Sequence, residues 1–373
     1  MKHIYREVMI MRHKACSEIY KGASYSRRKF FKNIAVGAAG LSLGSFGAYE
    51  KVSAENTNTG KSLVGFETGA DRREMISSAL KPFEDKIGAA VEGKQVVIKV
   101  NMGQIEGPLN ATHPDSVRGV LDFLRPIYKK RVIVAESTAG SERSTLDGFK
   151  NFFYTPMLKE YKVKFVDLNE QPETMKWIKD ANNHPLGINI IDTFLDPDVY
   201  MISVTRIKSH NCVVATLSLK NIVMASPINH YRQKIARGRN EKPLMHSGGN
   251  HGLSYNLFLV ANEGVQPDLA VLDGVVGMEG DGPVWGTPIE HKVVLAGTDW
   301  LAVDRIAVEL MGIDYSDVMY MRWCGDAGMG NDNLTNIEVT GSDYTKHIRN
   351  YRMHKNIAGQ LDWVRKFRST TGT

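Results

Sequence analysis

A group of cationic and imidazole side chains directly follows the apolar stretch 199–207. Lys208, His210 and Cys212 alternate just after this stretch, and Lys220 comes about one helix later. A buried strand that delivers such groups at its carboxyl end is how open α/β folds build ligand sites. Ammonium groups hold carboxylate, phosphate or sulfate through charge-assisted hydrogen bonds. The group therefore predicts a site for a small anion.

Further polar side chains follow two other apolar stretches of strand-like composition. Lys99 and Asn101 end one of them, and Glu136 ends the next. Because parallel strands bring their carboxyl ends together at one edge, we expect these groups to converge with Lys208 on a polar cleft. The alternative is that each lysine extends along apolar surface or pairs with a nearby acid such as Glu136 or Asp273.

Two histidines in this region offer imidazole nitrogen to a divalent metal. His210 and His246 are the candidates, with Glu279 as a third ligand. Their spacing is not a known zinc or iron motif, and a loop histidine is more often a hydrogen-bonded structural group. His210 is also a candidate general acid or base, since the adjacent Lys208 would lower its pKa towards the neutral form.

The predicted roles divide these residues into three sets. The catalytic candidates are His210, Glu136 and Lys208. The substrate-binding candidates are Lys99, Asn101, Lys220, Asn221 and Asp273. The candidate metal ligands are His210, His246 and Glu279.

An acidic and glycine-rich stretch follows the predicted strand 269–272. It carries Asp273, Glu279 and Asp281, and its glycines allow the backbone to approach a ligand closely. Glu279 or Asp281 would serve there as a metal ligand or an acid/base group. The alternative is a tight turn with solvated carboxylates. Asp304 lies among apolar residues of the next helix, where it either faces the site or pairs with a basic group.

Several enzyme classes lack their motifs here. The sequence holds no G-x-S-x-G elbow, no phosphate-binding G-x-x-x-x-G-K-[ST] loop and no G-x-G-x-x-G after a first strand. This argues against a serine hydrolase, a nucleotide-phosphate enzyme and a standard dinucleotide enzyme. No C-x-x-C occurs, so no cysteine-ligated iron–sulfur cluster is expected. Cys212 and Cys324 allow one disulfide in an oxidising compartment.

The elements that must position these groups alternate between strands and helices. Short β-branched apolar runs predict strands at 62–66, 95–100, 132–135, 163–168, 199–207, 269–272, 293–296 and 337–339. Apolar residues at helical spacing predict helices at 71–88, 117–128, 148–161, 213–224, 253–262, 300–311 and 357–367. This order predicts an α/β fold, with a mainly parallel sheet and helices on both faces.

Three local features refine this expectation. Pro82 predicts a kink or break in its helix. Asp299 is a helix N-cap by type and position. The segment 186–191 reads as part of an added hairpin, and the stretch 228–252 as a long inserted polar loop of the kind that is usually functional or mobile.

The basic character of the chain belongs to its first 54 residues. They hold ten Lys and Arg against three Asp and Glu, and the other 37 basic and 38 acidic residues nearly cancel. The folded part is therefore not expected to bind nucleic acid or a membrane surface through bulk charge. The 42% hydrophobic content is that of an ordinary globular protein.

The first 54 residues also carry an export pattern. Residues 26–32, SRRKFFK, resemble a twin-arginine motif, and a weakly apolar segment 34–48 too short for a stable membrane span follows. Val52-Ser53-Ala54 fits a cleavage site. We therefore expect a twin-arginine signal peptide at 1–54, a linker at 55–62 and a single α/β domain at 63–373. The chain would be exported to the periplasm by the twin-arginine translocase. An amphipathic N-terminal helix or an uncleaved anchor is the alternative.

The order of motifs resembles a family of unknown function, DUF362. The matching motifs are Lys99-x-Asn101, Thr112-x-Pro114, Glu136-Ser137, Lys208-x-His210, Lys220-Asn221, His246, Asp273-Gly274 through Gly282-Pro283, and Asp299-x-x-Ala302-x-Asp304. Together they span about residues 95–312. The resemblance implies the fold class and the candidate site, but no reaction, because the family has no settled activity. Members often carry a ferredoxin-like cluster domain, which is not found in this chain.

Two functions fit these observations. The first is an enzyme that acts on a small anionic substrate, with or without a divalent metal, in which lysines hold the anion and His210 or Glu136 moves protons. The second is a non-catalytic binding or accessory protein that uses the same cleft. Turnover that depends on His210 while ligand binding does not would separate them.

Overall fold

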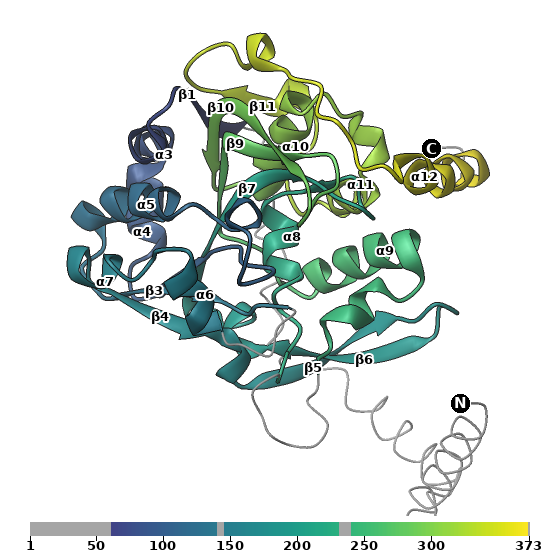
Figure 1. The fold of residues 1–373 in the computed structure, drawn as a ribbon, viewed down its shortest axis with the longest axis horizontal. Coiled ribbons are helices and arrows are strands. Elements are labelled where there is room, and N and C mark those ends of the chain that lie inside the picture. The colour runs from purple at the N-terminus through teal and green to yellow at the C-terminus, as the bar shows by residue number, and fades with distance from the viewer. Residues whose placement is uncertain (1–60, 140–144, 231–239, 372–373) are drawn as a thin grey trace, which may run out of the picture. The chain divides into compact units, whose positions relative to one another are not determined.

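A nine-stranded sheet organises the part of the chain that the structure, a computed structural model, describes: residues 61–139, 145–230 and 240–371 (Figure 1). Its strands are β1 Ser62–Thr68, β2 Gln95–Lys99, β3 Val132–Glu136, β4 Val163–Asp167, β7 Val199–Ser209, β8 Ala215–Thr216, β9 Leu269–Glu279, β10 Thr287–Gly297 and β11 Ile337–Val339. Their spatial order is β11-β1-β10-β9-β7-β2-β3-β4, and β8 pairs with β7.

The sheet is mainly parallel, as the sequence predicts. Strands β9, β7, β2, β3 and β4 run parallel to one another, whereas β10 is antiparallel to both β9 and β1. The register places Lys99 of β2 opposite Ser203 of β7 and opposite Ala135 of β3. The carboxyl ends of three neighbouring strands therefore meet at one edge.

Helices cover both faces of the sheet. One face carries α3 Arg72–Leu80, α4 Glu84–Ala90, α5 Pro114–Ile127, α6 Thr145–Asn151 and α7 Met157–Glu160. The other carries α8 Ser218–Val223, α9 Gly249–Asn262, α10 Trp300–Leu310 and α11 Met319–Asp326. Alternation along β2 divides the core, because Val96 and Ile98 pack into the first layer and Val97 into the second. This arrangement confirms the predicted α/β class.

Of three helix predictions, one is confirmed and two change in detail. The break at Pro82 is confirmed, since a 3₁₀ turn over Lys81–Phe83 separates α3 from α4. The helix expected at 148–161 is two short helices, α6 and α7, because Phe153 between them has a left-handed φ of 61°. The apolar segment 213–224 is helical only in α8, after the short strand β8.

Strand β9 is longer than predicted. It continues through the glycine-rich stretch as far as Glu279 and pairs with β10 along that length. The sequence expectation of a loop after residue 272 is therefore wrong, because the glycines and valines of this stretch fit a paired strand. Asp273 consequently lies inside a strand. The predicted hairpin is confirmed as the antiparallel pair β5 Glu173–Lys179 and β6 Pro185–Ile191, which forms its own small sheet.

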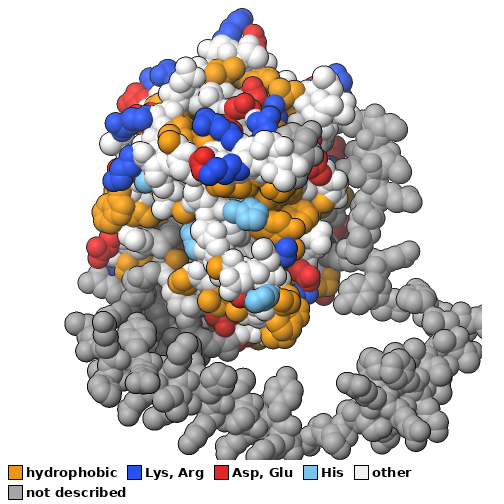
Figure 2. Space-filling model, turned by 90° about the vertical axis from the view of Figure 1, so that its right-hand side faces the viewer, with side chains coloured by type: hydrophobic (Ala, Val, Ile, Leu, Met, Phe, Trp, Pro, Cys, Tyr) orange, Lys and Arg blue, Asp and Glu red, His pale blue; other side chains and the backbone are white. Residues whose placement is uncertain are grey.

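The last helix, α12 Ile357–Thr371, lies on the side of the molecule that Figure 2 presents. On that face, basic and acidic side chains lie next to one another. Lys366 and Asp362 of α12, for example, form an ion pair with an N–O distance of 2.6 Å. The N-cap prediction for α10 is also confirmed, because Asp299 accepts hydrogen bonds from the backbone N–H groups of residues 301 and 302.

Three predicted segments lie wholly or partly outside the described residues. The signal peptide at 1–54 and residues 55–60 of the linker are among them, and so are residues 231–239 of the predicted loop 228–252. The described flanks of that loop form a bridge between Asn229 and Asn240, a 3₁₀ turn over Lys242–His246 and the start of α9. Among the helices of the described segments, none has the length and apolarity to span a bilayer.

Candidate functional site

A cavity of about 390 Å³ opens at the carboxyl ends of β2, β3 and β7. This volume lies within the range of small-molecule sites. The cavity brings together eight of the ten side chains that the sequence singles out. They are Lys99, Asn101, Glu136, Lys208, His210, Lys220, Asn221 and His246.

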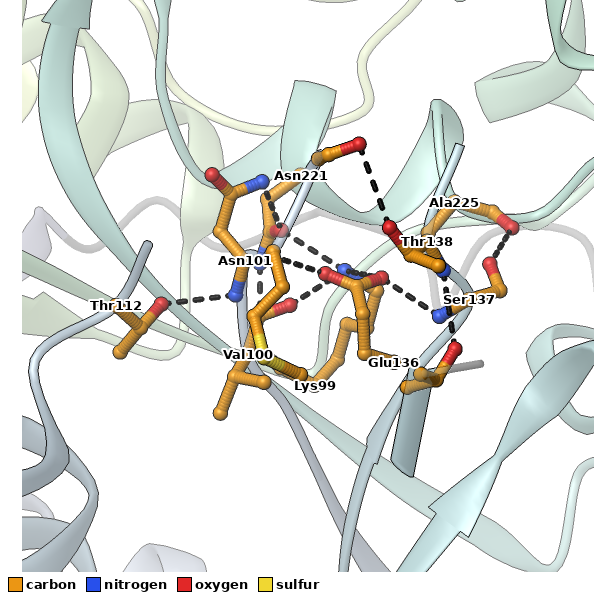
Figure 3. A network of polar contacts seen from close by, with 12 residues as sticks. Lys99, Val100, Asn101, Thr112, Glu136, Ser137, Thr138, Asn221 and Ala225 are labelled. Carbon is orange, nitrogen blue, oxygen red and sulfur yellow. Dashed lines mark hydrogen bonds and ion pairs between the residues drawn. The ribbon is translucent and has the colours of Figure 1, made fainter. Parts of the chain in front are cut away.

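A fully buried ion pair forms one wall of this cavity (Figure 3). Lys99 is 0% exposed, and its Nζ lies 2.7 Å from Oε1 of Glu136. The ammonium also donates to the carbonyl of Val100 and to Oδ1 of Asn221, which occupies all three of its N–H groups. Burial lowers the pKa of Lys99, and Glu136 opposes that shift. Lys99 therefore has no N–H left for a ligand.

The carboxylate of Glu136 is equally occupied. It accepts hydrogen bonds from the backbone N–H groups of Met102 and Ser137, at 2.6 and 2.7 Å, in addition to Lys99. These bonds tie the loops that follow β2 and β3 to each other. The geometry accordingly gives Glu136 a positioning role, whereas the sequence reasoning treats it as a proton-transfer group.

Two asparagines connect the ion pair to the centre of the cavity. Asn221 of α8 accepts from Lys99 and from Nδ2 of Asn101, and it donates to Oγ of Ser203 at 3.0 Å. The side-chain oxygen of Asn101 in turn accepts from Nζ of Lys208. These amides therefore hold both lysines in place. The sequence predicts that Asn101 and Asn221 bind substrate, whereas in the fold their side chains bind protein groups.

Lys208 retains binding capacity. Its Nζ donates to Asn101 and, at 2.8 Å, to the carbonyl of Asn110, which uses two of its three N–H groups. Burial lowers the pKa of Lys208 well below its usual value, and the charges of Arg206 and Lys220 lower it further. An anion in the cavity would relieve this repulsion.

His210 is held in a tight turn between β7 and β8. Its Nδ1 accepts from the backbone N–H groups of Cys212 and Val213, at 2.9 and 3.3 Å. These two donors assign the proton of the neutral ring to Nε2. Burial, followed by the charge of Lys220, keeps the pKa of His210 well below its usual range. The ring is thus a neutral hydrogen-bond donor through Nε2.

The same turn stores backbone strain. Val214 has φ 66°, a left-handed conformation that β-branched residues rarely adopt. Gln360 of α12 secures the turn, because it accepts from the N–H of Val214 at 2.9 Å and donates to the carbonyl of His210 at 3.0 Å. Strain that neighbouring structure holds in place is concentrated at functional sites. The turn that presents His210 has this property.

Lys220 differs from the other two lysines of the cavity. It is 6% exposed and lines the cavity, yet no described residue offers its Nζ a hydrogen-bond acceptor. Burial lowers the pKa of Lys220 to about 8. An amine with this pKa is partly neutral near neutral pH, and it is available both to bind an anion and to transfer a proton.

The helix that carries Lys220 begins in an unusual way. The N-cap residue of α8, Leu217, has no capping side chain, and Asp304 of α10 takes that role from outside the helix. Its carboxylate accepts from the N–H groups of Ser218 and Leu219 at 2.9 and 3.1 Å. Burial raises the pKa of Asp304 to about 7. Asp304 thus fixes the position of α8 through hydrogen bonds to its backbone. The sequence suggests two other roles, a place in the site or a pair with a basic group, and neither is found among the described residues.

The rim of the cavity contains residues to which the sequence reasoning gave no role. Trp285 is 79% exposed and His354 approaches Asp281 with an N–O distance of 3.5 Å. His246 is exposed at this rim, where reduced hydration and the charge of Lys220 lower its pKa. Asp281 was a candidate in the sequence, but no motif marks Trp285 or His354, which reach the cavity only through the fold.

Two predicted site residues do not line the cavity. Asp273 is fully buried, and its Oδ2 accepts from Arg72 and from Ser116, each at 2.8 Å. Glu279 accepts from the backbone N–H of Arg352. Both predictions are therefore wrong in placement. Asp273 lies inside β9, which continues past residue 272, and Glu279, the last residue of that strand, is bonded to Arg352 outside the cavity.

The predicted metal set is also not assembled as a group of three. In the described part of the chain, no three His, Cys, Asp or Glu side chains gather in an arrangement that could hold a metal ion. His210 and His246 share the cavity, but the Nδ1 of His210 already accepts two N–H groups, which keeps the proton on the cavity-facing Nε2. Cys212 and Cys324 are both free thiols.

A family model covers nearly all of the residues that line the cavity. The family model "Domain of unknown function (DUF362)" matches residues 96–309. A thylakoid-associated protein of Synechocystis sp. is 24% identical over 249 residues, which cover 66% of this chain and 72% of that protein.

Two solved structures are more distant. A Thermotoga maritima protein aligns at 12% identity and a TM-score of 0.36, over 60% of this chain and 55% of that one. The lactate racemase apoprotein of Thermoanaerobacterium thermosaccharolyticum aligns at 14% identity and a TM-score of 0.35, over 64% and 54%. This chain thus spans little more than half the length of either structure.

Proposed function

We propose that this chain, which belongs to the DUF362 family, is an exported enzyme that acts on a small anionic substrate in the cavity at the ends of β2, β3 and β7. The observation that carries the proposal is the Nζ of Lys220, which has no hydrogen-bond acceptor among the described residues, on a residue that is 6% exposed and lines the cavity. Burial removes much of the water around this amine, so an acceptor on a ligand would stabilise it.

Among the described residues that line the cavity, Oδ1 of Asn110 and Oγ1 of Thr216 have no hydrogen-bond partner. The lysine and histidine side chains of the cavity, in contrast, leave only donors unsatisfied. They are Nζ of Lys220, one N–H of Lys208 and Nε2 of His210. The buried acid of the wall, Glu136, is neutralised by Lys99 and by two backbone N–H groups. A molecule rich in negatively charged acceptors is the complement of such a surface, and a carboxylate or a phosphate fits this description.

The same groups support a division of work during a reaction. Lys208 would hold the anionic end of the substrate. His210 would donate from Nε2 to an oxygen on which negative charge develops, as a preorganised neutral donor. Lys220, with a pKa of about 8, would accept or deliver a proton near neutral pH. In this scheme His210 does not act as a base, because its free nitrogen lone pair already accepts two N–H groups.

The alternative is a protein that binds the same anion without turnover. The strained turn at Val214 favours the enzyme, because a passive binding site has no need of a costly backbone conformation in the turn that follows His210. The shifted pKa of Lys220 points the same way, since perturbed values gather at catalytic sites. Both functions share the cavity, so they separate only when turnover and binding are measured on the same variants.

Calorimetric titration of the full chain with acetate, pyruvate and inorganic phosphate tests the binding part of the proposal. Lys208→Gln and Lys220→Gln should each weaken the preferred anion by about tenfold or more, since a charge-assisted hydrogen bond contributes about 1.5–3 kcal/mol. Lys86→Gln is the matched control, because Lys86 is exposed on α4 and does not line the cavity. Unchanged affinity in both cavity variants, or binding of none of the three anions, would contradict the proposal.

His210 provides the test for catalysis. In His210→Asn the side-chain oxygen can still accept the N–H of Cys212 and hold the turn, but the donor towards the cavity is lost. We expect turnover of the anion found by titration to fall by about 10²–10³, the effect of removing one such donor, while the variant keeps most of its affinity. Binding without any turnover by the wild type would favour the non-catalytic alternative, and equal losses in binding and turnover would make His210 a binding group only.

Export rests on the leader and is proposed on that basis alone. Residues 26–32 carry the twin-arginine pattern, and residues 52–54 fit a cleavage site. The mature chain would then begin near residue 55 and work in the periplasm, where small carboxylates and phosphates reach it by diffusion.

A further inference from the structure

We infer that Lys220 is a nucleophile that forms an imine with the carbonyl group of a small 2-oxo acid, whose carboxylate Lys208 holds. The inference rests on the proposed function, because it needs an anion-binding cavity. It goes further by naming the substrate class and the covalent bond.

The three lysines of the cavity differ in the number of hydrogen-bond acceptors that their amino groups contact. Lys99 donates to three acceptors and Lys208 to two, whereas Lys220 has none among the described residues. The acceptors fix the amino groups of the first two lysines in place and occupy most of their N–H groups. Lys220 lacks that support, and burial lowers its pKa to about 8. A fraction of this amine is therefore neutral near neutral pH, and the neutral form is the nucleophile.

The backbone of Lys220 is fixed from both sides. Asp304 binds the two N–H groups that begin α8, at residues 218 and 219. Asn221, the next residue, is tied to β2 and β7 through Lys99 and Ser203. A nucleophile held in this way loses little conformational freedom when it attacks, which is the basis of proximity effects.

The neighbouring groups supply what a 2-oxo acid needs. Its carboxylate would accept the remaining N–H of Lys208, and the adjacent carbonyl would then face Lys220. The carbonyl oxygen would accept the Nε2–H of His210, a neutral donor that polarises the carbonyl without giving up its proton.

The covalent step balances without an oxidant or a reductant. The nitrogen of Lys220 attacks the carbonyl carbon and forms a C–N bond, and the carbonyl oxygen takes up a proton from the amine. Loss of this oxygen as water, with the second amine proton, gives the neutral imine. Solvent then protonates the imine nitrogen. The resulting iminium withdraws electrons from the adjacent carbons, which activates the bond to the carboxylate or to a neighbouring hydrogen.

Reductive trapping tests this inference directly. The full chain would be incubated with pyruvate and sodium borohydride, and its intact mass and peptide map would be measured. We expect one adduct per chain, with the mass of pyruvate less one oxygen atom, on the peptide that contains Lys220. Acetone has the carbonyl but no carboxylate, and we expect it to trap at least about tenfold more slowly because nothing positions it.

Two variants and one control make the result specific. Lys220→Arg should abolish the adduct, and Lys208→Gln should reduce trapping of pyruvate to the rate of acetone. The wild-type peptide map locates the adduct even where a variant fails to fold. Adducts spread evenly over exposed lysines such as Lys86 would overturn the inference.

The calorimetric titration with acetate, pyruvate and phosphate shows whether a failed trapping experiment refutes only the imine or also the proposed function. Binding of pyruvate that depends on Lys208, with no trapped adduct at Lys220, would overturn the imine and leave the anion site standing. No binding and no adduct would overturn both. Acetate serves as the ligand with a carboxylate but no carbonyl: it should compete with pyruvate for the cavity and give no adduct.

Discussion

Replacing Glu136 by Gln should destabilise the fold far more than it affects ligand binding. The side chain is buried and accepts from Met102, Ser137 and Lys99. A Gln side chain keeps one carbonyl oxygen but turns an NH₂ group towards one of these donors. It also leaves the ammonium of Lys99, which is 0% exposed, without a counter-charge.

The expected cost follows from the burial of the pair. Breaking a buried ion pair by removal of one partner costs about 3–5 kcal/mol, because an uncompensated charge remains inside. At about 2–4 °C per kcal/mol for domains somewhat smaller than this one, the unfolding temperature should fall by roughly 5–10 °C. Lys99→Met alone should cost a similar amount. The double variant should cost less than the two single variants together, by about 2–3 kcal/mol.

Thermal unfolding of the wild type, both single variants and the double variant measures this cycle. Glu92→Gln is the control, since Glu92 is an exposed acid near the end of α4. Titration with the preferred anion is done well below the unfolding temperature of each variant. If Glu136→Gln unfolded at the wild-type temperature but lost all turnover, the assignment of Glu136 as a positioning residue would be wrong, and its role as a proton-transfer group would be restored.

The remaining predictions concern the helix cap, the amine and the leader. Asp304→Ala leaves two backbone N–H groups of α8 without an acceptor, so thermal unfolding should show a loss of about 2–4 kcal/mol in the free energy of unfolding. Asp304→Asn should lose less. Equal stability of the wild type and both variants would refute the capping role of Asp304. Competitive labelling with acetic anhydride should show Lys220 reacting half-maximally near pH 8 and faster above it, because the amine loses its proton as the pH rises through its lowered pKa. Exposed lysines have a pKa of about 10.4. A labelling profile of Lys220 that coincided with theirs would remove the case for a neutral amine. Replacing both Arg27 and Arg28 by Lys should keep the chain in the cytoplasm in cell fractionation, and undiminished export would show that residues 26–32 are not the signal.

Much of the fold follows from local pattern in the sequence. Strands β2 and β7 are short apolar runs rich in β-branched residues, a composition that favours strands over helices. Helices predicted between successive strands indicate that the strands run parallel. The convergence of Lys99 and Lys208 then needs only the rule that parallel strands end together. The error at β9 has a local cause. Glycines inside a strand read as a loop, and only pairing with β10 shows that the strand continues to Glu279.

The roles of the residues within the site could not be predicted from the same rules, because they depend on which donor groups bond to which acceptors. From sequence, Lys99, Lys208 and Lys220 are three equivalent cations. In the fold, the first is saturated by Glu136 and two carbonyl groups, the second is two-thirds occupied, and the third has no described acceptor. Likewise His210 reads as a base until its Nδ1 is seen to accept two backbone N–H groups. Residue type predicts where a site lies. The chemistry of each group follows from the hydrogen bonds that remain unmade, and these appear only when segments more than a hundred residues apart, such as β2 and α8, come into contact.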